Sequence, residues 1–266
     1  MSLNSSSPAL QPDVVASKPP VQPMKRRILL SIALPIWAFL GFMLAQAIVI
    51  GLIAGLQKIG VPLDQISDSL FQLIAGAVVY GLTLLIVIGV PWLVKKARTT
   101  KEELGMQRLP LWTDFAWVPA GAIVYLVLTA TITGLAMTYL TFINYDQPQE
   151  TGFSNLAQQG EVILAFIMLV MIAPIAEELL FRGYLLGKLR KYAPLWVSIL
   201  ITSALFAAVH FAWNVGLDVF ALSIVLCLLR VITGSLWPSI MLHMLKNGVA
   251  FYFLFINPIV TSTLGG

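Results

Sequence analysis

The chain has 266 residues, of which 59% are hydrophobic and only 11% are charged, and its mean hydropathy is +0.90. A soluble domain of this size needs more polar surface, so the composition predicts a polytopic helical membrane protein. The apolar runs lack the alternation of a β-barrel strand, which excludes that class. The net charge of +4 does not indicate nucleic-acid binding, because the basic residues lie at the ends of apolar runs, where they determine topology.

The chain divides into a tail, one membrane domain and a second short tail. Residues 1–24 are rich in Ser and Pro and have no helical periodicity, so we expect a disordered tail. Residues 25–256 are expected to form a single transmembrane helical domain, followed by a short polar tail at 257–266. The apolar runs predict spans near residues 28–56, 70–94, 115–142, 162–189, 195–212, 217–232 and 237–256.

The predicted fold is an all-α polytopic bundle of about seven helices. The range is six to eight, because the last three runs are short for a membrane crossing and one of them could be broken or re-entrant. Lys and Arg gather before the first span and in the 95–114 and 183–194 connections. The positive-inside rule therefore predicts a multi-pass protein with a cytoplasmic N-terminus and a C-terminus on the opposite side. The 95–114 connection is expected to lie at the membrane interface, and Arg230 and Lys246 to snorkel towards it.

Three charged residues interrupt the fourth apolar run. Glu177, Glu178 and Arg182 would each cost on the order of 3 kcal/mol at membrane depth, so they are functional candidates. Glu178 and Arg182 are four residues apart on a helix, which predicts an ion pair between them. Glu177 is left without an obvious local partner.

Both histidines of the chain, His210 and His243, lie inside apolar segments. A lone buried histidine is more often a packing residue than a functional one. Here, however, Phe206 precedes His210 by four residues and Asn247 follows His243 by four, so each pair shares one helix face. A membrane offers few stable arrangements for these groups except facing one another, which predicts a shared polar site with Glu177.

The depths of the three residues agree only loosely. Counted from the basic end at 1.5 Å per residue, Glu177 lies at roughly 18 Å, His210 at roughly 24 Å and His243 at roughly 9 Å. Kinks at Pro174 and Pro238, or a displaced start of the last helix, must bring them together.

A carboxylate and two imidazoles in a desolvated pocket can activate a water molecule, and an amide such as Asn247 can stabilise an oxyanion. The set therefore predicts hydrolysis of an acyl bond. Glu177, His210 and His243 also equal a catalytic zinc ligand set with one open position, so zinc is an allowed cofactor. A metal-free glutamate mechanism is equally allowed by the same side chains, and the chain has no HExxH helix.

The order of these motifs resembles a known family. EExxxR, FxxxH and HxxxN on consecutive segments are similar to the three motifs of the CAAX protease and bacteriocin-processing family, also called the abortive-infection family of intramembrane proteases, which includes type II CAAX prenyl endopeptidase. The likeness covers about residues 162–255, and the LGM sequence at Leu104 resembles the loop that precedes the family's motifs.

The resemblance implies an intramembrane endopeptidase with its catalytic core at 161–256, acting near the terminus of a membrane-associated peptide or protein. It implies that Glu177 is the general base and that His210 polarises the water. It also implies that the oxyanion is stabilised by His243 and Asn247. The supporting residues would be Glu178, Arg182 and Phe206.

Two other classes of function are compatible with the same spans. A non-catalytic membrane scaffold or regulator would use the fold without the chemistry. A transporter or haem protein would use His210 and His243 as axial ligands but would give Glu177 no role, so no haem is expected.

Membrane lipids are expected partners. The substrate would be a prenylated C-terminus in a eukaryote, and a peptide pheromone, a bacteriocin leader or a membrane-protein terminus in a bacterium or plastid. The sequence does not indicate the oligomeric state.

Overall fold

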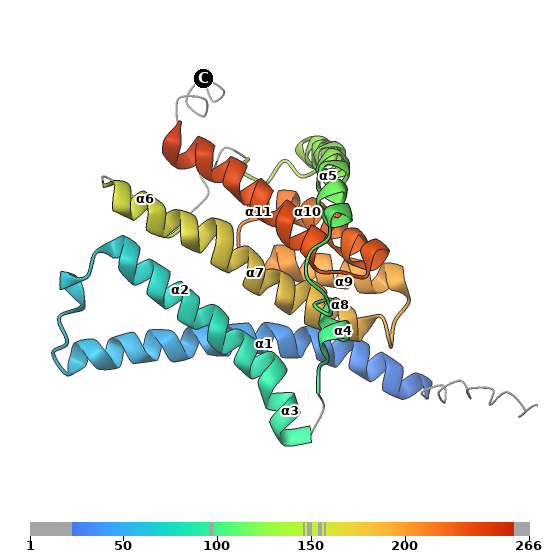
Figure 1. Ribbon diagram of the computed structural model, residues 1–266, viewed down its shortest axis with the longest axis horizontal. Coiled ribbons are helices and arrows are strands. Elements are labelled where there is room, and N and C mark those ends of the chain that lie inside the picture. The colour runs from blue at the N-terminus through green and yellow to red at the C-terminus, as the bar shows by residue number, and fades with distance from the viewer. Residues whose placement is uncertain are drawn as a thin grey trace, which may run out of the picture.

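The computed structural model describes residues 23–95, 98–145, 147, 151–153, 156 and 158–257. In these ranges the regular structure is helical, without strands, and follows the order shown in Figure 1. The predicted tails are 1–24 and 257–266; of these, residues 1–22 and 258–266 lie outside the described ranges, and Met24 already belongs to α1. The elements are α1 (Met24–Lys58), η1 (Leu63–Gln65), α2 (Asp68–Leu84), η2 (Leu85–Gly89), α3 (Val90–Lys95), α4 (Lys101–Leu104), α5 (Trp112–Tyr139), α6 (Gln159–Phe166), η3 (Ile167–Ile172), α7 (Ala173–Glu178), η4 (Leu179–Leu185), α8 (Leu186–Leu189), α9 (Leu195–Ala208), α10 (Trp213–Thr233), α11 (Trp237–Phe251) and η5 (Tyr252–Ile256).

Six helical runs of the described chain are long and apolar enough to cross a membrane. They occupy 24–58, 68–94, 112–139, 159–189, 213–233 and 237–256, which confirms the predicted all-α polytopic bundle. The seventh predicted span, 195–212, is the shorter helix α9 of 14 residues. At 1.5 Å per residue α9 is about 21 Å long, less than the hydrocarbon thickness of about 30 Å.

Helices α9 and α10 form a hairpin that starts and ends at the same end of the bundle. α9 begins just after the basic residues Arg190 and Lys191, and α10 returns to Arg230. The side chain of Arg230 contacts the backbone of α4, which follows the basic 95–98 segment. α11 therefore starts at this basic end and carries the chain to the other one (Figure 1).

The helix 159–189, which carries the first motif, and α10 are the most buried of the long helices. Half of the most apolar window of α10 is buried within the protein, and 39% of the window in 159–189. For 68–94 and α5 the buried share is 11%. These two runs thus pack against more of the protein, whereas 68–94 and α5 present most of their surface to the lipid.

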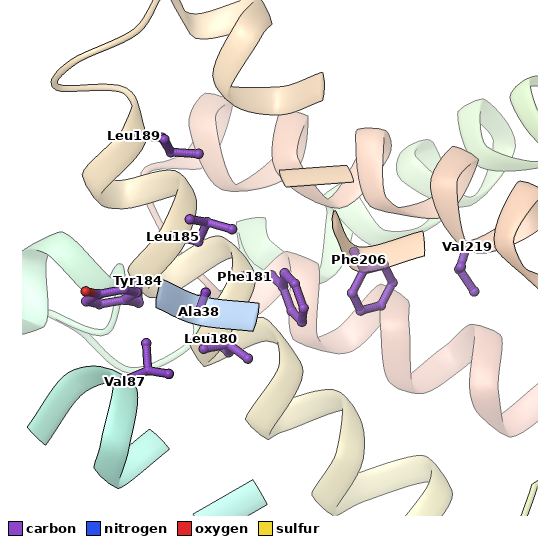
Figure 2. Packing of buried hydrophobic residues seen from close by; sticks show 9 residues of the cluster. All are labelled: Ala38, Val87, Leu180, Phe181, Tyr184, Leu185, Leu189, Phe206 and Val219. Atoms are coloured by element: carbon purple, nitrogen blue, oxygen red, sulfur yellow. The ribbon is translucent and has the colours of Figure 1, made fainter. Parts of the chain in front are cut away.

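Buried apolar side chains from several elements pack together beside the motif helices (Figure 2). The rings of Phe181 on η4 and Phe206 on α9 meet edge to face, with centroids 5.0 Å apart. The cluster fixes η4 against α1, η2, α9 and α10, and its members are Ala38, Val87, Leu180, Phe181, Tyr184, Leu185, Leu189, Phe206 and Val219.

The helix 159–189 continues through Pro174 because its backbone hydrogen bonds change from α-helical to π-helical spacing on either side of α7. Proline lacks an N–H group, so it leaves one carbonyl of the preceding turn without a helical donor. The residues before it, Ile167–Ile172, are π-helical, and a second π-helical segment, Leu179–Leu185, follows the glutamates. π-bulges of this kind accommodate an interruption of the hydrogen-bond ladder and are frequent at functional sites.

The 98–111 segment, which we call the strap, packs across the basic ends of the central helices. The backbone N–H of Leu236, just before α11, donates to the carbonyl of Gly105 over 2.9 Å. Glu103 accepts hydrogen bonds from both Lys188 and Lys191. Partial burial acts to raise the pKa of Glu103, but the two lysines outweigh it and hold the pKa at about 2. The segment predicted to lie at the membrane interface is therefore also a clamp between helices.

Arg230 corrects the prediction that it snorkels to the interface. The residue is only 2% exposed, and its Nη2 donates to the carbonyls of Glu102 and Glu103 at the end of α4. A Cβ at Gly105 would lie 2.5 Å from Arg230 Nε and would clash with it. Gly105 also has φ +78°, a backbone conformation that is strained for residues with a side chain. The glycine of the LGM sequence thus makes room for a buried arginine.

Substituting Gly187 tests the strap. An added Cβ would lie 2.8 Å from the backbone carbonyl of Glu103, so Gly187→Ala must displace the strap. We expect a loss of about 1–3 kcal/mol in the free energy of unfolding, measured by denaturation in detergent micelles. Gly51→Ala is the matched control, because nothing lies within 4 Å of its added Cβ. Equal stability of the two variants would contradict the clamp.

Candidate active site

Glu177 and Glu178 are consecutive residues of α7, so their side chains point about 100° apart and meet different partners. The hydroxyl of Tyr80, on α2, donates to Oε1 of Glu177 over 2.5 Å. The other oxygen, Oε2, lies 3.7 Å from Nε2 of His243 on α11. Glu177 thus uses one oxygen for anchoring and presents the other to the imidazole.

Glu178 joins the first motif to the third. Its Oε1 accepts a hydrogen bond from Nη1 of Arg182 over 2.8 Å and lies 2.9 Å from Nδ1 of His243. A carboxylate only accepts, so Nδ1 carries the proton and Nε2 is turned towards Glu177. The ion pair predicted from the four-residue spacing is present, and it also orients the histidine.

The ring of Phe206 lies at the centre of these side chains. It is 0% exposed, and the guanidinium carbon of Arg182 stands 4.4 Å from its centroid in a cation–π contact. The ring centroids of His210 and His243 are 5.1 and 5.8 Å away. One aromatic side chain therefore touches both histidines and the arginine, which explains the phenylalanine of the FxxxH motif.

His210 follows the last turn of α9, where its backbone N–H donates to the carbonyl of Ala207. Its Nδ1 lies 2.8 Å from the carbonyl oxygen of Phe206, so Nδ1 donates and Nε2 is the free ring nitrogen. Within the described ranges, no hydrogen bond or ion pair joins His210 to Glu177 or His243. The next residue, Phe211, has φ +52°, a left-handed conformation that turns the chain sharply towards α10.

Asn247 lies one turn beyond His243 on α11. Its Nδ2 donates to the carbonyl of Leu169 over 2.9 Å. Leu169 is five residues before Pro174, so at π-helical spacing it is the carbonyl that the proline leaves without a donor. Asn247 therefore ties α11 to η3, and its second amide hydrogen lies outside that bond.

Exposure separates these residues into two groups. The side chains of Glu178 and Arg182 are 0% exposed and that of His243 is 4% exposed. The side chain of Glu177 is 16% exposed, and His210 is half-buried. The supporting ion pair is shielded from solvent, whereas Glu177 and His210, which are expected to contact the water molecule, are accessible to solvent.

The buried start of α11 brings His243 to the depth of the two glutamates. Ser235 and Leu236, which precede the helix, are both 0% exposed because the strap covers them. α11 thus begins inside the protein, and His243 reaches the two glutamates. The estimate of roughly 9 Å for His243 placed the helix start too near the surface.

Two polar contacts were not predicted from the sequence. Tyr80 lies in a span that carried no motif, and only its polar hydroxyl within an apolar run could have indicated it. Asp218 lies within α10 and accepts from Tyr125 and Thr129 of α5. Lys246, expected to snorkel, instead forms an ion pair with Asp218 at 3.1 Å.

Zinc binding stays a prediction. In both histidines Nδ1 is engaged and Nε2 is left over, which is the orientation that a metal-binding imidazole has. Yet no three His, Cys, Asp or Glu side chains of the described ranges are grouped as a metal site. The steps proposed below use protein groups alone.

Comparison with known proteins confirms the family resemblance. Residues 159–249 match the family model of Type II CAAX prenyl endopeptidase Rce1-like proteins. An uncharacterised 24.3 kDa protein of Escherichia coli is 35% identical over 98 residues, which are 35% of this chain and 45% of that protein. UPF0177 protein YxdF of Lactococcus lactis is 28% identical over 134 residues, 50% of this chain and 70% of that protein. No solved structure matches. The matched family segment contains all three motifs.

Removing one partner of the buried pair tests its supporting role. Arg182→Met leaves Glu178 as an uncompensated buried charge, so we expect a loss of about 3–5 kcal/mol in the free energy of unfolding. The double variant Glu178→Gln with Arg182→Met removes both charges and should recover much of that loss. Thermal unfolding of the purified proteins measures both effects. Wild-type stability of the single variant would show that the pair does not support the fold.

Proposed function

We propose that this protein is an intramembrane endopeptidase that hydrolyses a peptide bond near the terminus of a membrane-associated peptide or protein. The observation that carries the proposal is the approach of Glu177 Oε2 to His243 Nε2 at 3.7 Å, with His243 held by a buried ion pair. The family match supports the same class of reaction.

In the proposed reaction Glu177 is the general base. Its Oε2 takes a proton from a water molecule that His210 Nε2 also contacts, and the resulting hydroxide attacks the carbonyl carbon of the substrate. Glu177 then gives the proton to the leaving nitrogen as the C–N bond breaks. One carboxylate thus serves as base and then as acid, a role that suits a side chain held by Tyr80 and partly exposed.

The oxyanion of the intermediate needs hydrogen-bond donors. We assign this role to His243 and Asn247, which lie one turn apart on α11. In this proposal His243 is doubly protonated: Glu178 holds its Nδ1–H, as the aspartate does in a Ser-His-Asp triad, and its Nε2–H donates to the oxyanion. Asn247 is fixed by its bond to Leu169 and offers its second amide hydrogen.

A groove between the fourth long helix and α11 supports access from the lipid. It has a volume of about 700 Å³ and is lined by residues that include Val170 and Gly248. These are the chain neighbours of Leu169 and Asn247, whose hydrogen bond borders the proposed oxyanion site. An extended substrate segment in this groove would reach the site without leaving the membrane.

Glu177→Gln tests the reaction because it removes the base and keeps the shape. We expect cleavage to fall by at least about 10²–10⁴-fold. The substrate is unidentified, so the measurement is a proteomic comparison of peptide termini in cells that carry the wild-type chain or the variant. His210→Ala should give the same uncut peptides. Asp64→Asn, an exposed acid in the first loop, is the charge-matched control.

The comparison also separates an enzyme from a scaffold. A protease predicts termini that appear with the wild type and Asp64→Asn and disappear with Glu177→Gln. Identical termini in all strains, with a cellular effect that survives Glu177→Gln, would assign the protein to the non-catalytic class.

Tyr80→Phe tests the anchoring of the base. Without the hydroxyl, Glu177 is less well placed, so we expect kcat to fall by roughly 10- to 100-fold with little change in KM. Peptides identified by the proteomic comparison serve as substrates for the purified protein.

Tyr125→Phe is the matched control, since it removes a similar hydroxyl-to-carboxylate bond at Asp218. It should leave kcat unchanged. A kcat that falls in neither variant, or equally in both, would overturn the role of Tyr80.

A further inference from the structure

A second groove lies at the basic end of the bundle, away from the proposed active site. It runs between α1, α3 and the end of α8, and its volume is about 520 Å³. That volume lies within the range of roughly 300–1,000 Å³ that is typical of small-molecule sites. Its lining includes Leu30, Leu34, Trp37, Val94, Tyr184 and Lys188.

The wall of this groove is apolar and borders the membrane. Leu30 and Leu34 lie one turn apart on α1, and Val94 on α3 faces them. Val94 is 74% exposed, and its neighbour Leu93 is 67% exposed, so the α3 side of the groove is open to the surroundings of the bundle. In a membrane this opening faces lipid, which makes an acyl chain the nearest apolar occupant.

The mouth of the groove is basic. Lys188 lines it, together with Thr99 and Tyr192. Arg27 donates its Nε to the carbonyl of Tyr192, which places a second cation beside the groove and leaves both terminal nitrogens of the guanidinium outside that bond. Glu103 accepts from Lys188 but also from Lys191, so one acid faces two lysines and the cluster keeps a positive charge.

We propose that this groove binds one anionic phospholipid. The acyl chain lies along Leu30, Leu34 and Val94, and the phosphate lies at Lys188 and Arg27. The combination of an apolar wall and a basic mouth selects a lipid, because a soluble phosphate would leave the wall uncovered and a zwitterionic lipid would bring no net charge to the lysine. The site does not depend on the proposed hydrolysis, since the groove contains none of the proposed catalytic residues.

Native mass spectrometry of the purified full chain with phosphatidylglycerol or phosphatidylcholine tests the proposal. We expect one molecule of phosphatidylglycerol to be retained in clear preference to phosphatidylcholine. Lys188→Gln should weaken that binding by about fivefold, the effect of removing roughly 1 kcal/mol per basic side chain near an anionic surface. Lys101→Gln removes the same charge from an exposed position at the same end and should leave binding unchanged.

A second variant, which blocks the groove sterically, tests the proposal even if Lys188→Gln does not fold. Ala33 lines the groove, so Ala33→Trp should fill it and displace the lipid while the ion pairs of the strap stay intact. Folding of each variant is checked by thermal unfolding. Equal retention of the two lipids, equal effects of Lys188→Gln and Lys101→Gln, or full binding by folded Ala33→Trp would each overturn the proposal. Displacement of the lipid by inorganic phosphate alone would also overturn it.

Discussion

A single oxygen atom, Oε1 of Glu178, connects the parts of the site. It accepts a hydrogen bond from Arg182 on its own helix and contacts His243 on α11. Glu178 and His243 are 65 positions apart in the chain. A carboxylate with no exposed surface is tolerated only when its charge is compensated, and Arg182 supplies that compensation here. The helices must therefore pack in the one register that brings Arg182, Glu178 and His243 together. In that register the neighbouring residue, Glu177, faces the free nitrogen of the same imidazole.

The register is set as much by the bundle's basic end as by its interior. The strap covers the start of α11, and the Leu236 to Gly105 hydrogen bond holds that start inside the protein. Arg230, at the end of the preceding helix, is held by the same segment through the α4 carbonyls. Because both ends of the α10–α11 connection are bonded to the strap, the depth of His243 depends on residues about 130 positions earlier in the chain. This dependence accounts for Gly105 in the strap, where an added side chain would be strained and would have to displace Arg230.

The sequence predicts what depends on local spacing and not what depends on helix packing. The ion pair of Glu178 with Arg182 follows from a four-residue repeat, and the helical spans follow from hydropathy. The bond from Tyr80 to Glu177 joins residues 97 positions apart, and no periodicity indicates it. Arg230 and Lys246 were expected to reach water, because an isolated helix offers them nothing else. In the bundle they find the α4 carbonyls and Asp218 instead. Hydropathy also predicted α9 as a full span, since composition does not reveal the sharp turn at Phe211.

A hydrolase inside a membrane has to reconcile two requirements. Its supporting charges are strongest where water is excluded, whereas its base must reach a water molecule. Consecutive residues on one helix meet both requirements here, because a rotation of about 100° turns Glu178 into the protein and Glu177 towards the more accessible side. Glu177 is partly exposed and so lacks the tight packing that holds Glu178 in place. One hydrogen bond from Tyr80 on α2 positions it instead. The peripheral helices that precede the family segment therefore contribute to the proposed chemistry and do more than anchor the protein in the bilayer.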